Sequence, residues 1–453
     1  MGNHACLHPL SWQPDISQRF ACLQREPGAI LLDSGQPASL GGRFDIASAW
    51  PLQQIQPQDR EPPEHFLHRA RQLLQQLPAI HSHAANTDDL PFTGGLIGYL
   101  GYHFGQPDSR HPRQLPDACI GLYDWALIND HHRQHSWLFC HPAMLDARRQ
   151  QLLQLFQAPC IPTAEPPFEL LDHFRPLIDP QEYRHAIGQV HLAIECGQCR
   201  QINYTQRFSS SYRGNPWHAW RSLRAECPVP YAAFVRLDEQ SAILSASPER
   251  FLAVNAGVVE ARPIKGTRRR GLTAEEDRRL ADELLASAKD RAENLMIVEL
   301  QKKEFAPLCH DIHTPQLAVL ESYPNVHHLV SCIRARLDPG RDALDLLLHC
   351  FPCASISGTP RQPAQQLIDR LEACAREIYC GSIFHLDGRG EFDSSVCIRT
   401  LLARDGVIHC WGGGGITRES VWQDEYRESV DKIRVLMDVL QREYGQVFPL
   451  PAD

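Results

Sequence analysis

The sequence predicts an α+β protein, and three observations lead to this class. Strand-like and helix-like stretches alternate after Asp172 without a visible repeat, which is not the pattern of regular βαβ units. Two strand-like stretches, Glu391–Leu402 and Val407–Trp411, are separated by Asp405-Gly406, a dipeptide typical of tight antiparallel hairpins. The length of 453 residues is enough for two or three domains with a large buried core.

Further strands are expected at Ala242–Ser245 and Val258–Ile264. Thr273–Glu276 reads TAEE, a capping box that opens a helix, and the apolar residues of that helix recur at helical spacing at Leu280, Leu284 and Ala288. Ser287–Asp290 starts a second, adjoining helix.

A C-terminal helix is expected after Ser420–Gln423, which reads SVWQ and also fits a capping box. Its apolar side is formed by Val430, Ile433, Met437 and Leu440.

A linker is expected at Pro159–Pro167, where four prolines in nine residues prevent a continuous helix. It separates an N-terminal region, residues 1–165, from a second region, residues 175–445. The glycines of Pro91–Gly105 indicate tight turns or crowded backbone in the first region.

Charge and composition exclude several classes of function. The net charge of −9 disfavours binding to nucleic acid or to an anionic membrane, and no apolar run is long enough to span a bilayer. Residues Met1–Gln24 are polar and do not resemble a secretory signal, so a cytoplasmic protein is expected. The pairs Cys196/Cys199 and Cys350/Cys353 lack zinc-site or thioredoxin-like spacing and are interpreted as packed thiols.

Two helices carry acidic pairs. Asp290 and Glu293 are three residues apart, as are Glu425 and Glu428, so each pair lies on one side of its helix. Glu425, Glu428 and Lys432 form a stripe that borders the apolar stripe of the C-terminal helix. Clustered carboxylates suit a hard cation such as Mg²⁺, whereas solvated helix faces are the alternative for either pair alone.

Two residues are candidates for the chemistry. Lys265 follows the strand-like segment Val258–Ile264 and precedes Gly266, a place where a desolvated lysine acts as a nucleophile. Glu249 follows another strand and acts as a general acid if burial raises its pKa. The alternatives are a surface cation and a turn residue paired with Arg250.

Other residues are candidates for binding. His327-His328 offers a base or a polar contact, and Arg399, within an alternating strand, offers a clamp for a carboxylate. Gly412–Gly415, just beyond the next strand, can present backbone N–H groups to an anion, although the stretch lacks the ending of a P-loop.

Together these segments resemble the chorismate-utilising enzymes, and among them the aminodeoxychorismate synthases, whose lysine nucleophile corresponds to Lys265. The resemblance covers about Tyr183–Leu440 and is weaker in the first 170 residues, where Gly94–Tyr102 and Leu31–Ser34 match. The matching motifs, in order, are GQCRQINYTQRF (197–208), SASPERF (245–251), PIKGT (263–267), DRAENLMIV (290–298), HHLVS (327–331), YCGSI (379–383), DSSVCIRTL (393–401), GGGGI (412–416) and EYRES (425–429).

The resemblance implies a layered α/β sandwich with large antiparallel sheets flanked by helices, to which both halves of the chain contribute. It implies conversion of chorismate and ammonia to 4-amino-4-deoxychorismate, for 4-aminobenzoate and folate, with Mg²⁺ as cofactor. Ammonia would come from a separate glutamine amidotransferase subunit in a heterodimer, because no Cys–His–Glu glutaminase domain is recognisable in the sequence.

The resemblance also implies a role for each site residue. Lys265 attacks C2 of chorismate, Glu249 protonates the departing C4 hydroxyl, and His328 joins them as a third catalytic residue. The implied metal residues are Glu293 and Glu428, supported by Asp290 and Glu425. The implied substrate-binding residues are Arg399, Thr359, Gly413, Gly414, Gly415 and Lys432.

The chain departs from the family pattern in three places. Residues Glu299–Pro307 read ELQKKEFAP where the family continues D-L-x-R-N-D-x-G-R, Phe384 replaces a usual glycine, and Gln198 replaces a usual aspartate. Two alternatives stay open: another chorismate conversion such as anthranilate formation, in which alanine usually stands at the position of Lys265, and a divergent ligand-binding or regulatory paralogue.

Overall fold

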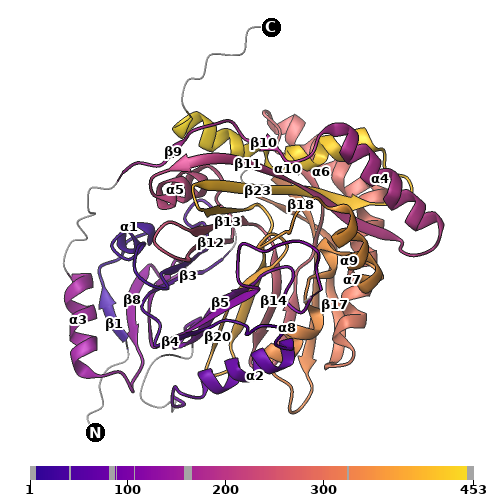
Figure 1. Ribbon diagram of the computed structural model, residues 1–453. Coiled ribbons are helices and arrows are strands. Elements are labelled where there is room, and N and C mark those ends of the chain that lie inside the picture. Colours follow the sequence, from indigo (N-terminus) through magenta and orange to yellow (C-terminus); the bar gives the residue numbers. More distant parts are fainter. Residues whose placement is uncertain are drawn as a thin grey trace.

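The computed structural model describes residues 7–39, 42–80, 87, 89–106, 108–157, 166–323 and 326–445. Two large antiparallel sheets form its centre and helices cover their outer faces, as predicted for an α+β sandwich (Figure 1). In spatial order, the first sheet contains β1 (Leu7–Leu10), β8 (His135–Cys140), β7 (Trp125–Asp130), β3 (Phe44–Ser48), β2 (Ile30–Asp33), β12 (Tyr231–Arg236), β13 (Ala242–Ser247), β22 (Thr400–Arg404), β23 (Val407–Ile416), β11 (Gln201–Arg213) and β10 (Arg175–Pro176), with β9 (Glu169–Leu170) and β19 (Gly358–Thr359) also paired to β11.

The second sheet lies beside the first. It contains β16 (Ile264–Arg269), β18 (Val326–Leu337), β15 (Val258–Ala261), β14 (Arg250–Asn255), β21 (Phe392–Val396), β20 (Ser382–Asp387), β5 (Gly95–Leu100), β6 (Ala118–Tyr123) and β4 (Gln53–Ile55), with β17 (Cys309–Ser322) paired to β18.

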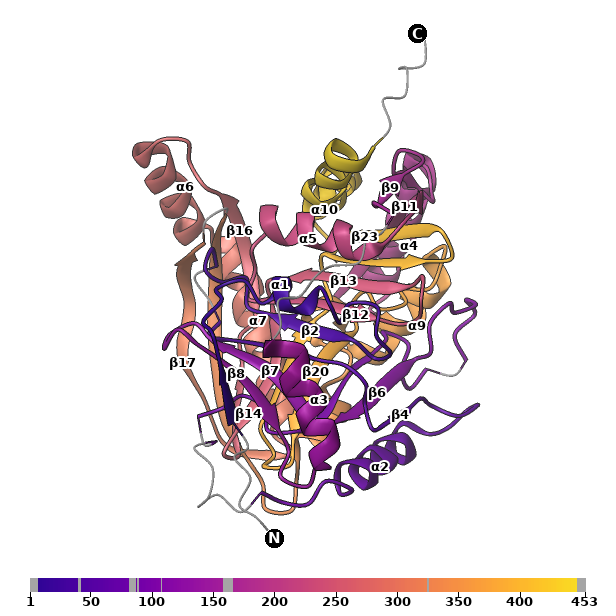
Figure 2. The same cartoon turned by 90° about the vertical axis from the view of Figure 1, so that its left-hand side faces the viewer.

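The helices are α1 (Ser17–Phe20), α2 (Pro63–Leu74), α3 (Asp146–Gln157), α4 (Pro180–Glu195), α5 (Pro216–Glu226), α6 (Ala274–Ala286), α7 (Ala288–Phe305), α8 (Ala343–Cys350), α9 (Arg361–Leu371) and α10 (Trp422–Tyr444), with a 3₁₀ turn, η2, at Ala354–Ile356. Helices α5 and α10 lie together above the first sheet, whereas α2 lies at the opposite end of the molecule (Figures 1 and 2). Within the described ranges, no helix is long and apolar enough to cross a membrane.

Each sheet joins a block of strands from the first part of the chain, up to Cys140, to a block of strands from Glu169 onward. In the first sheet β2 pairs with β12, and in the second β5 pairs with β20. The expected linker at Pro159–Pro167 lies mostly outside the described residues.

Alternation along the central strands divides the core into two layers. On β13, Ile243 belongs to the apolar cluster between the two sheets, and its neighbour Leu244 belongs to the cluster beneath α1, α5 and α10. Phe234 of β12 belongs to the same cluster as Leu244, and its ring packs edge-on against Trp217 of α5. Because both faces of the first sheet are covered, its central strands β12, β13 and β22 are almost entirely buried.

Several local expectations are confirmed. Asp405 and Gly406 form the tight turn between β22 and β23, with φ of 50° and 75°. Thr273 caps α6 by accepting a hydrogen bond from the Glu276 backbone N–H at 3.2 Å. Ser287 then starts the adjoining helix α7 by accepting from the Asp290 N–H, so that Ala288 belongs to α7 and not to α6.

Other expectations are wrong. The second capping box does not form, because α10 begins after Val421 and the Ser420 hydroxyl donates to the Glu425 carboxylate instead, at 2.6 Å. The stretch Glu391–Leu402 is two strands, β21 and β22, and Val258–Ile264 is interrupted after Ala261.

Candidate active site

Glu249 and Lys265 come together at the edge between the two sheets. Glu249 lies between β13 and β14, and Lys265 is the second residue of β16, which corrects the prediction that it follows a strand running from Val258 to Ile264. The Lys265 Nζ donates to the carbonyl oxygen of Ser355 at 3.1 Å. The Ser355 hydroxyl donates to Glu249 Oε1 at 3.3 Å, so one residue of η2 contacts both groups.

Glu249 has the protonation behaviour of a general acid. Its side chain is 5% exposed, and burial raises its pKa to about 7, although the charge of Lys265, the Ile264 backbone N–H, the Ser355 hydroxyl and Arg399 limit the rise. A substantial fraction of Glu249 therefore holds a proton near neutral pH, where an exposed glutamate holds almost none.

The protonation equilibrium of Lys265 is shifted toward the neutral amine. Burial lowers its pKa, the carboxylates of Glu249 and Glu293 act in the opposite direction, and the Lys432 ammonium lowers the pKa further. Because only the neutral amine has a free electron pair, burial increases the fraction of Lys265 able to attack an electrophile.

Arg399 lies at the sharp bend between β21 and β22. The prediction that it lies within an alternating strand is therefore wrong. The φ of Arg399 is 50°, and its carbonyl accepts from the Ala246 N–H. In the described part of the chain its guanidinium forms no hydrogen bond or ion pair, and burial lowers its pKa. A partly buried, unpaired guanidinium is suited to a carboxylate of a ligand.

His328 lies on β18 with 3% of its surface exposed. Its Nδ1 is 2.8 Å from the Thr267 hydroxyl, and burial together with the nearby charge of Arg399 lowers its pKa to about 3. His328 is therefore a neutral imidazole, able to donate or accept a hydrogen bond. Its neighbour His327 points to Asp277 at 3.0 Å and away from this group.

The C-terminal helix brings two acids and a lysine to β23. A methyl group at Gly414 would lie 3.3 Å from Glu425 Oε2, 3.6 Å from Glu428 Oε1 and 3.4 Å from Lys432 Nζ. Lys432 forms a salt bridge of 2.7 Å with Glu428 and donates to the Gly413 carbonyl at 3.0 Å. The lack of a side chain at Gly414 thus keeps the space beside both carboxylates open.

The two acids of this helix differ in protonation. Burial raises the pKa of Glu425, and the negative charge of Glu428 adds to that effect. Burial also works against ionisation of Glu428, yet Lys432 and the nearby Lys289 and Lys265 hold its pKa below its usual value. Glu428 therefore remains a carboxylate at neutral pH.

The acids of α7 are placed differently from one another. Glu293 lies near enough to Lys265 to favour the charged form of the lysine. Asp290 instead forms an ion pair with Arg268 at 3.0 Å and packs against Gly266. Within the described residues, no three His, Cys, Asp or Glu side chains converge closely enough to form a metal cluster by themselves. Glu293 of α7 and Glu428 of α10 both interact electrostatically with Lys265, and carboxylate oxygens of this kind suit a hard cation completed by further oxygen ligands.

The glycines lie inside a strand and not beyond one, which corrects the prediction. Gly412–Gly415 belong to β23 and pair with β11, while the pairing of β22 with β23 reaches only Cys410. Among the described residues, one edge of the glycine stretch thus pairs with no strand, and on the stretch the Gly413 carbonyl accepts from Lys432. Thr359 lies in β19, where its carbonyl accepts from the Arg200 N–H at 2.7 Å.

Ser355 was missed by the sequence analysis, and so was the polar network beneath it. Arg376 is fully buried and donates to both oxygens of Glu372, at 2.9 and 2.6 Å, and to the carbonyls of Ile356 and Asn203. The nearby Cys350 and Cys353 are buried free thiols. Of the other pair, Cys199 is a buried free thiol and Cys196 is an exposed one.

Replacing Arg376 with leucine is expected to lower the free energy of unfolding by about 3–5 kcal/mol, because the Glu372 carboxylate stays buried without its partner. Urea denaturation followed by circular dichroism measures this loss. The exposed pair Arg442–Glu226 provides the control, since Arg442→Leu should cost at most about 1 kcal/mol. Equal effects of the two substitutions would contradict the importance of the buried network.

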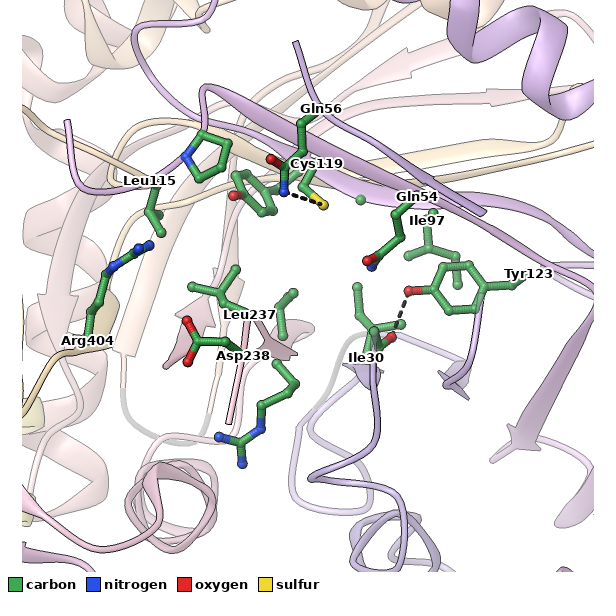
Figure 3. Close-up of a pocket in the computed structure, with 17 residues that line it drawn as sticks. Ile30, Gln54, Gln56, Ile97, Leu115, Cys119, Tyr123, Leu237, Asp238 and Arg404 are labelled. Atoms are coloured by element: carbon green, nitrogen blue, oxygen red, sulfur yellow. Dashed lines mark hydrogen bonds between the residues drawn. The ribbon is translucent and has the colours of Figure 1, made fainter. Parts of the chain in front are cut away.

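Two cavities can be compared with the site. One of about 470 Å³ is lined by Pro248 and Ile264, which directly precede Glu249 and Lys265. The other, of about 170 Å³, lies between the first residues of β2 and the ends of β4, β5, β6 and β12, and Figure 3 shows Gln54, Tyr123 and Arg404 around it. Neither lining includes any of the predicted site residues, so the site coincides with neither cavity.

Known proteins match this chain over nearly its whole length. The family model for chorismate binding enzyme matches residues 28–438. "Aminodeoxychorismate synthase component 1" of Salmonella typhimurium is 39% identical over 95% of this chain and 97% of its own length, and the protein of that name from Escherichia coli is 37% identical over 96% and 98%. The crystal structure of anthranilate synthase component I from Streptococcus pneumoniae aligns with a TM-score of 0.76 at 26% identity, covering 88% of this chain and 93% of that one. These matches show that the chain belongs to the chorismate-binding enzyme family.

Proposed function

We propose that this enzyme converts chorismate and ammonia to 4-amino-4-deoxychorismate, the precursor of 4-aminobenzoate and folate. The observation that carries the proposal is the pairing of Lys265, whose pKa burial lowers, with Glu249, whose pKa burial raises to about 7. A neutral amine beside a protonated acid is the combination needed to displace a hydroxyl group as water. The relatives that match at 37–39% identity carry the name of this synthase.

The proposed reaction has two steps. The Lys265 amine forms a bond to C2 of chorismate while both double bonds of the ring diene shift, the C4–O bond breaks, and Glu249 gives its proton to the leaving hydroxyl, which departs as water. Ammonia then bonds to C4, both double bonds shift back, and the C2–N bond to Lys265 breaks. The amine of Lys265 is regenerated, and the proton released from ammonia restores Glu249. Two steps replace one difficult displacement.

The remaining site residues bind and orient the substrate in this proposal. Arg399 and the open backbone edge of Gly413–Gly415 would hold the enolpyruvyl carboxylate, with Thr359 and Lys432 at the border of the same region. His328, neutral and hydrogen-bonded to Thr267, would contact the substrate without adding charge.

Mg²⁺ would be held by Glu293 and Glu428, with Glu425 beside them. Asp290 would support these ligands without contacting the ion. When bound, the ion neutralises the ring carboxylate of the substrate.

All of these residues fall within 175–445, which we propose as the catalytic region, with 1–165 completing the two sheets. Ammonia would reach the site from a glutamine amidotransferase subunit, in line with "component 1" in the names of the relatives.

The test is product formation from chorismate, Mg²⁺ and ammonium by the purified chain alone. Liquid chromatography with mass detection is expected to show 4-amino-4-deoxychorismate. Fluorescent anthranilate in its place would assign the protein to the other chorismate amination. Chorismate binding in a calorimeter without any product would support the regulatory alternative and overturn the proposal.

Glu428→Gln is expected to raise the Mg²⁺ concentration for half-maximal activity by about tenfold or more, because it removes one negative oxygen ligand. Asp290→Asn is the matched control and should have a smaller effect, since Asp290 is paired with Arg268. Activity titrated against Mg²⁺, with calorimetry of the ion in the presence of chorismate, measures both. A larger effect of Asp290→Asn would reverse the assignment of the two acids.

A further inference from the structure

The turn around η2 connects the two reactive side chains through a single residue. Ser355 is 3% exposed, and its two polar groups face different partners: the carbonyl oxygen accepts from Lys265 Nζ at 3.1 Å, and the hydroxyl donates to Glu249 Oε1 at 3.3 Å. A change in the charge of either side chain therefore acts on the same residue.

The Ser355 hydroxyl makes a second contact, with a cysteine thiol. The Cys353 Sγ lies 3.2 Å from the Ser355 Oγ, and both side chains are buried. A serine hydroxyl has one hydrogen, and Ser355 uses it toward Glu249, so the thiol is the donor to Ser355. Burial raises the pKa of Cys353 to about 12, which keeps the S–H hydrogen in place over the whole working range of pH.

The backbone of the turn is held from three sides. Asn203 Nδ2 donates to the Ser355 carbonyl at 2.8 Å, and Arg376 donates to the next carbonyl, that of Ile356, at 3.0 Å. Arg361 donates to the carbonyls of His349 and Phe351 before the turn and is paired with Glu304 of α7. Ser355 consequently cannot follow a movement of Glu249 or Lys265 without breaking this network.

We propose that Ser355, oriented by the Cys353 thiol, is a positioning residue that ties the proton of Glu249 to the amine of Lys265. Its hydroxyl keeps Oε1 of Glu249 as a hydrogen-bond acceptor, so that Oε2 carries the acidic proton. Its carbonyl takes one N–H of Lys265 and thereby orients the electron pair of the amine. The catalytic consequence rests on the proposed function, whereas the effect on Glu249 does not.

The decisive experiment measures Glu249 itself and requires no substrate. The full-length protein is labelled with ¹³C at the glutamate carboxyl groups, the Glu249 resonance is identified by its loss in Glu249→Gln, and its midpoint of titration is followed by NMR. Ser355→Ala is expected to raise that midpoint by roughly one pH unit, because the carboxylate loses a donor. Ser357→Ala is the matched control: Ser357 is fully buried in the same turn, but its hydroxyl donates to the Cys353 carbonyl at 3.2 Å.

A midpoint that rises in Ser355→Ala and stays constant in Ser357→Ala supports the proposal, and equal midpoints in the two variants overturn it. If Ser355→Ala does not fold, Cys353→Ala takes its place. It should shift the midpoint in the same direction by about half as much, and no shift in that variant overturns the proposal.

Kinetics with chorismate and ammonium then separate this proposal from the function. Ser355→Ala is expected to lower kcat about tenfold, with KM within about threefold of the wild-type value, and to move the falling limb of the pH–rate profile upward. Absence of product in the wild-type protein would reject the proposed function and leave the NMR result valid. Normal turnover by Ser355→Ala would reject the positioning role alone.

Discussion

Lys265→Ala is expected to lower the rate of 4-amino-4-deoxychorismate formation by roughly 10³-fold or more, the range seen when an enzyme loses its nucleophile. Removal of the amine abolishes the first step, whereas Glu249 and the acids of α7 and α10 remain in place. Initial rates with chorismate, Mg²⁺ and ammonium, followed by chromatography, measure the loss. KM for chorismate should change much less than kcat, because Lys265 contributes to the transition state and not to the binding of the carboxylates.

Mass spectrometry provides the complementary measurement. Wild-type protein incubated with chorismate and Mg²⁺ but without ammonia is expected to carry an adduct on the Lys265 peptide, and Lys265→Ala should carry none. Lys302→Ala is the control, since Lys302 lies on the exposed side of α7 in a salt bridge with Glu299 at 3.0 Å. If Lys265→Ala turned over chorismate and ammonium at the wild-type rate, covalent catalysis would be disproved.

Glu249→Gln is expected to lower kcat by about 10²–10⁴-fold, the usual contribution of general acid catalysis. It should also change the pH dependence. The pKa of Glu249 is raised to about 7, so the protonated form that can act as an acid predominates below pH 7 and disappears above it. The wild-type rate should therefore fall as the pH rises through about 7, and this limb should be absent in Glu249→Gln.

Stability provides a second test of the same residue. A group whose pKa is higher in the folded state contributes stability that is fully present below its unfolded pKa and is lost as the pH rises through the folded pKa. Glu249 therefore stabilises the folded state most at pH 4 and least at pH 8. The difference in melting temperature between Glu249→Gln and wild type should shift in favour of the variant from pH 5 to pH 8. A difference independent of pH would contradict the raised pKa.

Part of the site was predictable because it follows from short-range rules. The spacing of Glu425 and Glu428 places both on one side of a helix, and the structure puts Gly414 between their carboxylates. The turn at Asp405-Gly406 requires positive φ at both positions, which this dipeptide tolerates. Such features depend on a few neighbouring residues, so the sequence contains all the information that they need.

Other features depend on partners distant in the sequence and were wrong or missed. Arg399 follows an alternating pattern, but the chain must pass from the second sheet to the first at this point, and it turns with a positive φ. Ser420 has the spacing of a helix cap, yet the buried Glu425 takes its hydroxyl. Ser355 carries no local signal at all, because its importance comes from Glu249 and Lys265, which belong to other segments of the chain.

The joining of early strands to late strands in each sheet has a consequence for synthesis. β2 finds its partner β12 only after the middle of the chain has been made, and β5 needs β20, which lies close to the C-terminal end. During translation these strands have open edges, which are prone to pair with other chains. Neither sheet can close until its late strands have been made, and long-range pairing of this kind folds slowly. Dependence on chaperones and low yield at high expression temperature are therefore expected properties of this fold.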